Sequence, residues 1–285
     1  MAIEFQQVNF AYGQGSLAQP VLHNVNLTIP AGQITAIVGQ TGSGKSTLVQ
    51  HINGLLKPTA GQVKVDDFVL SAETKEKDLP KLRAQVGMVF QFPESQLFAA
   101  TVLEDVMYGP LNFGQSKVAA RQAAEKALQR VGLAEEFWTK SPFALSGGQM
   151  RRAAIAGTLA VDPAIMVLDE PAAGLDPRGQ AELLDLVRSL KDEGKTVVLI
   201  SHQMDQVMAL ADQVVVMAHG EVQAVEDPVT LFNRPAAWFQ QEHLELPTAG
   251  KFALELEQGG WHFDQRPLTL EALAAAINAK EVEHE

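Results

Sequence analysis

The sequence predicts an α/β fold with a largely parallel sheet, a helical insertion and a small C-terminal α+β domain. The first observation is a series of short β-branched runs, such as "QITAIVG", "AIMVLDE" and "TVVLISH", that are apolar throughout, as in strands covered on both faces. The second is that helical stretches separate many of these runs. The third is a glycine-rich turn, "GQTGSGKST", that joins the first run to an apolar helix.

The main domain is expected to take up most of the chain. With 285 residues, 46% of them apolar and 20% charged, the chain can bury one sizeable core and carry a small appendage. The stretch "SKVAARQAAEKALQRVGL" has apolar residues at helical spacing, so a helical subdomain is expected over about residues 92–160. This insertion would interrupt a nucleotide-binding domain formed by residues 1–240.

Residues 241–285 are expected to form the C-terminal domain, a candidate dimerisation element. There "KFALELEQGGWHF" alternates about a Gly-Gly turn, which predicts a β-hairpin. The following segment predicts a helix that begins at the N-cap Thr269. Its apolar face would carry Leu270, Leu273 and Ile277.

Charge and composition exclude several classes of protein. The net charge of -12 argues against broad electrostatic wrapping of DNA or RNA, so no nucleic-acid partner is expected. The absence of cysteine excludes disulfides, thiolate metal sites and cysteine nucleophiles. No apolar window approaches the roughly 18 residues that a membrane span needs, so the chain itself is expected to be soluble.

The glycine-rich turn fits the phosphate-loop pattern, because Gly39, Gly44, Lys45 and Ser46 fill its fixed positions after a strand and before a helix. Successive backbone N–H groups and the helix N-terminus would hold phosphate oxygens, Lys45 would reach the terminal phosphates, and the Ser46 hydroxyl would bind Mg²⁺. The residues expected to bind the nucleotide here are Gly39, Gln40, Thr41, Gly42, Ser43, Gly44, Lys45, Ser46 and Thr47.

A second part of the site is indicated by "AIMVLDEP", a buried strand that ends in two carboxylates (the Walker B pattern). Asp169 would bind Mg²⁺, and Glu170 would orient and polarise the water that attacks the γ-phosphate. The pair could instead cap a helix or lie solvated at the strand end. His202 ends another apolar strand and could contact the γ-phosphate and the water, although a lone histidine is more often structural.

A second glycine turn, "LSGGQMRRAAIAG", begins another helix with Ser146, Gly147, Gly148 and Gln149. It offers a further set of N–H groups and a hydroxyl for an anion. One chain with one nucleotide has no use for two such turns. If two copies of the fold pack head to tail, however, the turn of one chain would close over the γ-phosphate held by the other.

These motifs together resemble those of ATP-binding cassette (ABC) ATPases, over about residues 1–235. The resemblance implies ATP and Mg²⁺ as cofactors and ATP hydrolysis as the activity. Tyr12 in "FAYGQG" resembles the aromatic residue that stacks on adenine, although simple packing would also explain it. Gln91 in "MVFQFPESQLF" resembles the glutamine that senses Mg²⁺ and the γ-phosphate. Asp176 resembles the aspartate that communicates across the dimer, and His202 the switch histidine.

The segments "FQFPESQLFAATVLEDVMYGPLNFG" and "ALSGGQMRRAAIAGTLA", with the C-terminal extension, are similar to the ATPase subunits of energy-coupling factor (ECF) importers, in particular the second ATPase of heterodimeric systems. The resemblance implies a peripheral subunit on the cytoplasmic face of the cell membrane. Its partners would be a second ABC ATPase, a transmembrane coupling subunit and a substrate-binding membrane subunit that takes up vitamins or transition-metal ions. The alternatives are a conventional ABC transporter ATPase and a soluble ABC ATPase acting on DNA or ribosomes.

The segment "FQFPESQLF" is also the candidate contact with a membrane partner. Apolar side chains ringed by acids suit a groove that accepts a helix carrying Arg or Lys. The expected groove residues are Phe92, Leu97 and Phe98 with Glu94, Glu104 and Asp105. The alternative is that both phenylalanines fill the small core of the helical insertion.

Overall fold

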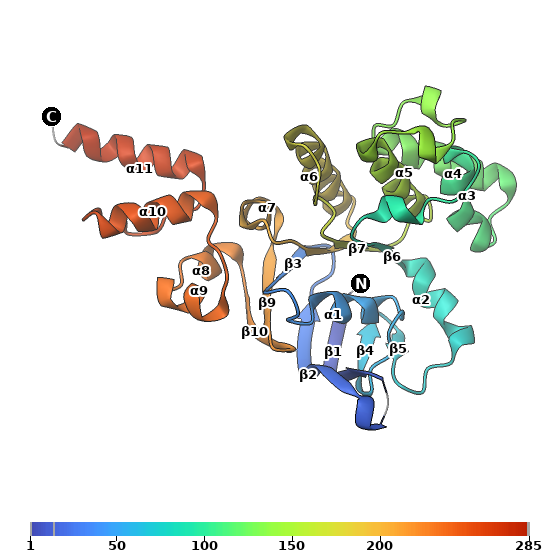
Figure 1. The fold of residues 1–285 in the computed structure, drawn as a ribbon, viewed down its shortest axis with the longest axis horizontal. Helices are drawn as coiled ribbons and strands as arrows, with labels where there is room; N and C mark the ends of the chain where they lie inside the picture. Colours follow the sequence, from blue (N-terminus) through green and yellow to red (C-terminus); the bar gives the residue numbers. More distant parts are fainter. Residues whose placement is uncertain (1, 14, 284–285) are drawn as a thin grey trace.

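The computed structural model describes residues 2–13 and 15–283 and contains two sheets (Figure 1). The larger sheet has six strands in the order β10-β9-β3-β8-β7-β6, and all of them except β10 run parallel. Its strands are β3 (Ile34–Val38), β6 (Val86–Val89), β7 (Ile165–Asp169), β8 (Thr196–Ile200), β9 (Gln213–Ala218) and β10 (Glu221–Glu226). All residues of β3, β6, β7 and β8 are buried, which confirms the expectation of a sheet covered on both faces.

The smaller sheet is antiparallel, with four strands in the order β2-β1-β4-β5. Its strands are β1 (Ile3–Tyr12), β2 (Gln19–Ile29), β4 (Ala60–Val65) and β5 (Phe68–Leu70). The helix α1 (Lys45–Ile52) lies between the two sheets, because Leu48, Val49 and Ile52 belong to one buried cluster with residues of both. Packing on two sides therefore fixes the start of α1, where the phosphate loop ends.

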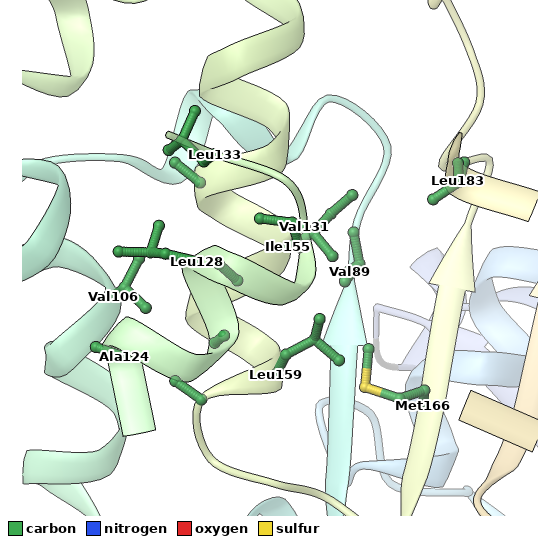
Figure 2. Packing of buried hydrophobic residues seen from close by; sticks show 14 of the residues in the cluster. Val89, Val106, Ala124, Leu128, Val131, Leu133, Ile155, Leu159, Met166 and Leu183 are labelled. Atoms are coloured by element: carbon green, nitrogen blue, oxygen red, sulfur yellow. The ribbon is translucent and has the colours of Figure 1, made fainter. Parts of the chain in front are cut away.

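A helical layer covers the opposite face of the larger sheet. It contains α3 (Val102–Asn112), α4 (Lys117–Arg130), α5 (Gly147–Leu159) and α6 (Pro177–Asp192), and α2 (Leu79–Gln85) precedes β6. Figure 2 shows the shared core, in which Leu159 of α5 lies near Val89 of β6 and Met166 of β7, and Leu128 of α4 lies near Val106 of α3. The helices α3, α4 and α5 follow β6 and precede β7, as the predicted helical insertion requires.

The C-terminal segment is helical, so the predicted β-hairpin is wrong. The remaining helices are α7 (Met204–Leu210), α8 (Pro228–Phe232), α9 (Ala236–Glu242), α10 (Thr248–Gln258) and α11 (Leu270–Glu283). Within α10, Ala249, Ala253 and Leu256 pack on one side at helical spacing. Gly260 (φ 93°) ends the helix, where the N–H of Trp261 donates to the carbonyl of Leu256 at 3.0 Å. The Gly-Gly pair thus terminates a helix instead of turning a hairpin.

The predicted start of the last helix is confirmed. The hydroxyl of Thr269 accepts a hydrogen bond from the N–H of Ala272 at 3.2 Å. Leu273 is buried and Ile277 packs beside it, but Leu270 is exposed and does not share their face. None of the helices in residues 2–13 and 15–283 is long and apolar enough to cross a membrane. Short 3₁₀ turns are η1 (Gly15–Leu17), η2 (Glu76–Asp78), η3 (Pro93–Gln96), η4 (Glu135–Phe137) and η5 (Pro142–Ala144).

Candidate nucleotide-binding site

The phosphate loop connects β3 to α1 through backbone conformations that require glycine. Gly39 has φ 145°, and a Cβ placed on it would lie 2.1 Å from the carbonyl oxygen of Met217. Gly44, directly before α1, has φ 101° and acts as the N-cap without a side chain. The glycines leave the N–H groups at the start of α1 free of side-chain caps, as an anion-binding helix start needs.

Lys45 is buried inside this loop. Its Nζ donates to the carbonyl oxygens of Gly39 at 2.8 Å and of Gln40 at 2.7 Å. Burial lowers the pKa of Lys45, while the nearby carboxylates of Glu170 and Asp169 act in the opposite direction. The hydroxyl of Ser43 is also buried and has no hydrogen-bond partner within the described part of the chain. An ammonium group and an unpaired hydroxyl therefore lie in a loop shaped to hold an oxyanion.

Asp169 and Ser46 form the oxygen pair expected for Mg²⁺. Asp169 ends β7 and is 7% exposed. Burial raises the pKa of its carboxyl, and a hydrogen bond from the Ser46 side chain opposes that effect. Mg²⁺ in phosphate-transfer sites takes one or two protein oxygens and completes its shell with phosphate and water. A hydroxyl and a carboxylate beside the phosphate loop fit this requirement.

Glu170 brings the three predicted catalytic residues together. Its backbone has φ 49° and its N–H donates to the carbonyl of Ile200 at 3.0 Å, which ties the end of β7 to β8. Its Oε2 accepts a hydrogen bond from Nε2 of Gln91 at 2.9 Å, and its Oε1 lies 2.9 Å from Nε2 of His202. These residues follow three neighbouring parallel strands, β6, β7 and β8, so they meet at one edge of the sheet.

Tyr12 lies at the end of β1, next to the phosphate loop. Its hydroxyl is 3.2 Å from the hydroxyl of Thr47, and its ring packs edge-on against Phe10 with the centroids 4.8 Å apart. The side chain nevertheless remains 43% exposed. The ring therefore packs on one side and leaves a surface exposed, so stacking on adenine stays a prediction.

The second glycine turn does not join this group. Ser146 caps α5 with its hydroxyl, and the side chain of Gln149 accepts from the N–H of Ser146 at 2.9 Å, a complete capping box. A Cβ on Gly147 or Gly148 would meet nothing within 4 Å. Figure 1 shows α5 among the helices of the insertion, whereas α1 lies between the two sheets. The turn therefore faces open space instead of the phosphate loop of its own chain.

Asp176 also has a structural role within the chain. It is the N-cap of α6, and its Oδ1 accepts a hydrogen bond from the N–H of Gly179 at 2.7 Å. Within residues 2–13 and 15–283, its other carboxylate oxygen has no hydrogen-bond partner, so the cap does not exclude the expected role across a dimer.

The expected groove around "FQFPESQLF" is only partly as predicted. Phe98 is 60% exposed and Phe92 is 52% exposed, so neither fills the core of the insertion, whereas Leu97 is buried. Asp105 accepts hydrogen bonds from the N–H groups of Phe98 and Ala99 and is thus used by its own loop. The two exposed phenylalanines therefore remain available to a partner, whereas the carboxylate of Asp105 is bound within its own chain.

Glu94 is not available to a partner either, because Arg151 holds it. Nε and Nη2 of Arg151 lie 3.1 Å from the two carboxylate oxygens of Glu94. The expectation that Glu94 awaits a partner's Arg or Lys is therefore wrong. Sequence analysis missed the contact between Arg151 and Glu94, although the two arginines among the small apolar residues of "MRRAAIAG" were an available signal.

Comparison with known families identifies the fold. The family model described as ABC transporter matches residues 22–173. A second model, described as AAA domain, putative AbiEii toxin, Type IV TA system, matches the shorter stretch 140–209. The Energy-coupling factor transporter ATP-binding protein EcfA2 of Leuconostoc mesenteroides is 63% identical over 286 residues, with 100% of both chains covered. The protein of the same name from Lactiplantibacillus plantarum is 50% identical, over 97% of this chain and 94% of its own.

Solved structures agree. The structure of cbiO1 from Clostridium perfringens, part of the ABC transporter complex cbiONQ, has a TM-score of 0.73 at 35% identity and covers 90% of this chain and 96% of its own. A dimeric ATP-binding cassette in a post-hydrolysis state, bound to ADP and Pi, also has a TM-score of 0.73, at 32% identity, over 79% of this chain and 98% of its own. By sequence and by structure, the chain belongs to the ABC transporter family and, within it, to the energy-coupling factor transporter ATP-binding proteins.

Proposed function

We propose that the chain binds and hydrolyses ATP as the motor subunit of an ECF-type importer of vitamins or transition-metal ions. The observation that carries this proposal is the placement of Glu170 between Gln91 and His202, at the sheet edge where Asp169 lies beside Ser46. A carboxylate held on both oxygens next to a phosphate loop has the geometry needed to orient a water molecule for attack on a phosphoryl group.

Each residue of the edge has a distinct part in this chemistry. Lys45 and the loop N–H groups hold the β- and γ-phosphates, and Tyr12 offers its exposed ring to adenine. Ser46 and Asp169 would hold Mg²⁺, which neutralises charge on the phosphates when bound. Glu170 orients the attacking water, while Gln91 and His202 hold its carboxylate in place and contact the γ-phosphate.

The Ser146 turn completes the site of a second ABC ATPase. Its exposed position, the space around Gly147 and Gly148, and the start of α5 behind it suit an anion that a neighbouring chain brings in. A head-to-tail dimer would place Ser146, Gly147, Gly148 and Gln149 over the partner's γ-phosphate and Asp176 at the junction between the chains. The partner is either a second copy or a paralogous ATPase.

The membrane partners are expected to dock beside Gln91. Phe98 and Tyr108 stack edge-on with their centroids 4.9 Å apart, and both are exposed. Glu104, one turn before Tyr108, is exposed and can attract a basic residue. An apolar patch with an acid beside it suits a helix of a transmembrane coupling subunit, which in turn holds the substrate-binding membrane subunit. This places the chain at the cytoplasmic face of the cell membrane.

The division of the chain follows from the same proposal. Residues 1–240 form the nucleotide-binding domain, with the helical subdomain at about 92–160, and residues 241–285 form the C-terminal domain that contributes to dimerisation. In support, Ala249, Ala253 and Leu273 make a small buried cluster of their own.

The substitution Glu170→Gln tests the proposed chemistry in the assembled transporter. The amide keeps a hydrogen-bonding group but loses the negative charge that polarises water, so we expect ATP turnover to fall by about 100-fold or more. ATP affinity should change by less than about threefold, since Lys45 and Ser46 are untouched. Glu182→Gln, which removes an exposed carboxylate paired with Arg152, is the matched control and should leave turnover unchanged. Near-normal turnover with Glu170→Gln would remove Glu170 from this role.

A further inference from the structure

Arg151 is a buried arginine in the first turns of α5, with only 4% of its surface exposed. Its Nε and Nη2 donate to the two carboxylate oxygens of Glu94, each at 3.1 Å. Its Nη1 donates to the carbonyl of Pro171 at 3.4 Å and to that of Ala173. A guanidinium group carries five N–H donors in a rigid fork, so one side chain can hold a carboxylate and two carbonyls at once.

The contacts of Arg151 join three segments that are distant in the sequence. Glu94 lies three residues after Gln91, in η3. The two carbonyls belong to the loop that directly follows Glu170. Arg151 itself lies five residues after Ser146, on the helix that this serine caps. One buried side chain therefore connects the neighbourhoods of Gln91 and Glu170, which face the nucleotide of the same chain, with that of Ser146, which faces the partner's nucleotide in the proposed dimer.

Both loops that Arg151 contacts bend through unfavourable backbone conformations. Glu170 has φ 49° and Phe92 has φ 55°, values that residues other than glycine rarely adopt. Such conformations persist only where the surrounding structure holds them. Arg151 supplies contacts to both bends, since its guanidinium carbon lies 5.9 Å from the centre of the Phe92 ring in addition to the bonds already described.

We infer that Arg151 is a positioning residue for ATP hydrolysis. By binding Glu94 and the two carbonyls, it fixes the loop that carries Glu170 relative to the Ser146 turn and to the exposed surface at Phe92. When the surface at Phe92 moves, the carboxylate of Glu170 and the Ser146 turn therefore move with it. The inference rests on the proposed function, because it assigns Arg151 to the same hydrolytic site.

The test compares two neighbouring arginines. Arg151→Lys keeps the charge, but a single ammonium cannot reproduce the fork that holds Glu94 and both carbonyls. Arg152→Lys is the control: Arg152 pairs with Glu182 at 2.7 Å and is only partly buried, with 35% of its side chain exposed. A third variant, Glu94→Gln, weakens the same contact from its other side. All three variants are assembled with their partner subunits. The measurements are kcat and KM for ATP, with nucleotide affinity and Tm of the full chain.

A loss of kcat without a change of KM for ATP distinguishes a positioning role from a merely structural one. Arg151→Lys should lower kcat by about tenfold or more and change KM by less than about twofold, because a small displacement of Glu170 slows chemistry without disturbing Lys45. Glu94→Gln should lower kcat by about threefold, and Arg152→Lys should change neither constant.

Two results would overturn the inference. The first is a kcat for Arg151→Lys and Glu94→Gln within about twofold of the wild type. The second is a loss of ATP affinity as large as the loss of kcat, which would mean that Arg151 supports the whole site and does not position Glu170. The proposed function is judged separately in the same assay, by hydrolysis in the wild type and its loss in Glu170→Gln.

Discussion

The two glycine turns of this protein begin helices in similar ways but differ in what surrounds them. In the phosphate loop, Gly39 is enclosed by backbone and Lys45 is buried against carbonyls of the same loop. At the second turn, a Cβ on Gly147 would meet nothing within 4 Å, and Ser146 is exposed. The first turn is thus enclosed within one chain, whereas the second is open to solvent. This difference is what the proposed head-to-tail dimer requires, in which the second turn would contribute to the site of another chain.

The largest expected difference between the two turns is in stability. Gly39→Ala forces a side chain to within 2.1 Å of the Met217 carbonyl at φ 145°, and this strain and overpacking should cost about 4 kcal/mol of unfolding free energy. Gly147→Ala meets nothing within 4 Å and should change stability by less than about 0.5 kcal/mol. Denaturant unfolding of the two variants checks this pair. Equal losses would mean that the second turn is enclosed as well.

Next to the phosphate loop, His51 of α1 should make the unfolding free energy sensitive to acid. This ring is buried, its Nδ1 lies 2.7 Å from the carbonyl of Thr47, and burial lowers its pKa to about 4. Between its unfolded pKa, near 6.5, and about pH 4, the unfolded chain binds a proton that the folded chain does not. The unfolding free energy should therefore fall by about 3 kcal/mol from this group as the pH drops through that window.

Unfolding measured at several pH values checks the His51 contribution. His51→Gln should flatten the decrease between about pH 6.5 and 4, whereas His262→Gln, at an exposed histidine, should leave it unchanged. An identical pH profile for wild type and His51→Gln would refute the assignment.

Nucleotide affinity should depend on the first turn only. Lys45→Ala removes the ammonium and leaves the carbonyls of Gly39 and Gln40 without their donor, so ATP should bind about 100-fold more weakly to the chain. The neighbouring substitution Lys57→Ala, at a lysine paired with Glu76, is a suitable control and should leave affinity unchanged. Calorimetric titration with ATP measures both.

Turnover, in contrast, should depend on both turns. Ser146→Arg places a bulky side chain at the exposed start of α5, where a partner's nucleotide would lie, and should lower turnover of the assembled complex by about tenfold or more. ATP affinity of the separate chain should stay within about twofold of the wild type. A comparable loss of affinity in the separate chain would show that Ser146 serves the nucleotide of its own chain.

The phosphate loop was predictable from sequence because its information is local. The pattern from Gly39 to Thr47, the strand before it and the helix after it all lie within a few residues, and the structure reproduces them. The carboxylates at the end of β7 were predictable for the same reason, because the apolar run of the strand stops where Asp169 and Glu170 begin. His202 was expected beside the carboxylates because parallel strands end at the same edge of a sheet, whereas Gln91 was expected there only through the family resemblance.

Long-range pairing was not predictable from the residues. Glu94 and Arg151 are 57 positions apart, and no local pattern in either segment predicts their contact. The hairpin error has a local cause: the alternation in "ALELE" suits both a strand and an amphipathic helix, and the Gly-Gly pair suits both a turn and a helix end. The first strand went unrecognised because the register shift between Phe5 and Val8, where Gln7 has φ 50°, breaks the alternation in β1.

The most direct test of a site shared between chains is ATP-dependent cross-linking. The sequence contains no cysteine, so Thr41→Cys at the exposed part of the phosphate loop and Ser146→Cys at the second turn would be unique reporters. The two cysteines are placed in different copies of the chain. If the partner is a paralogous ATPase, the first cysteine is placed in its corresponding phosphate loop. The substitution Glu170→Gln is added so that the complex retains ATP. A short bismaleimide reagent should then join two chains when ATP is present and should not join the two turns of one chain carrying both cysteines. A cross-link within one chain, or none between chains in a complex shown to be assembled, would contradict the account.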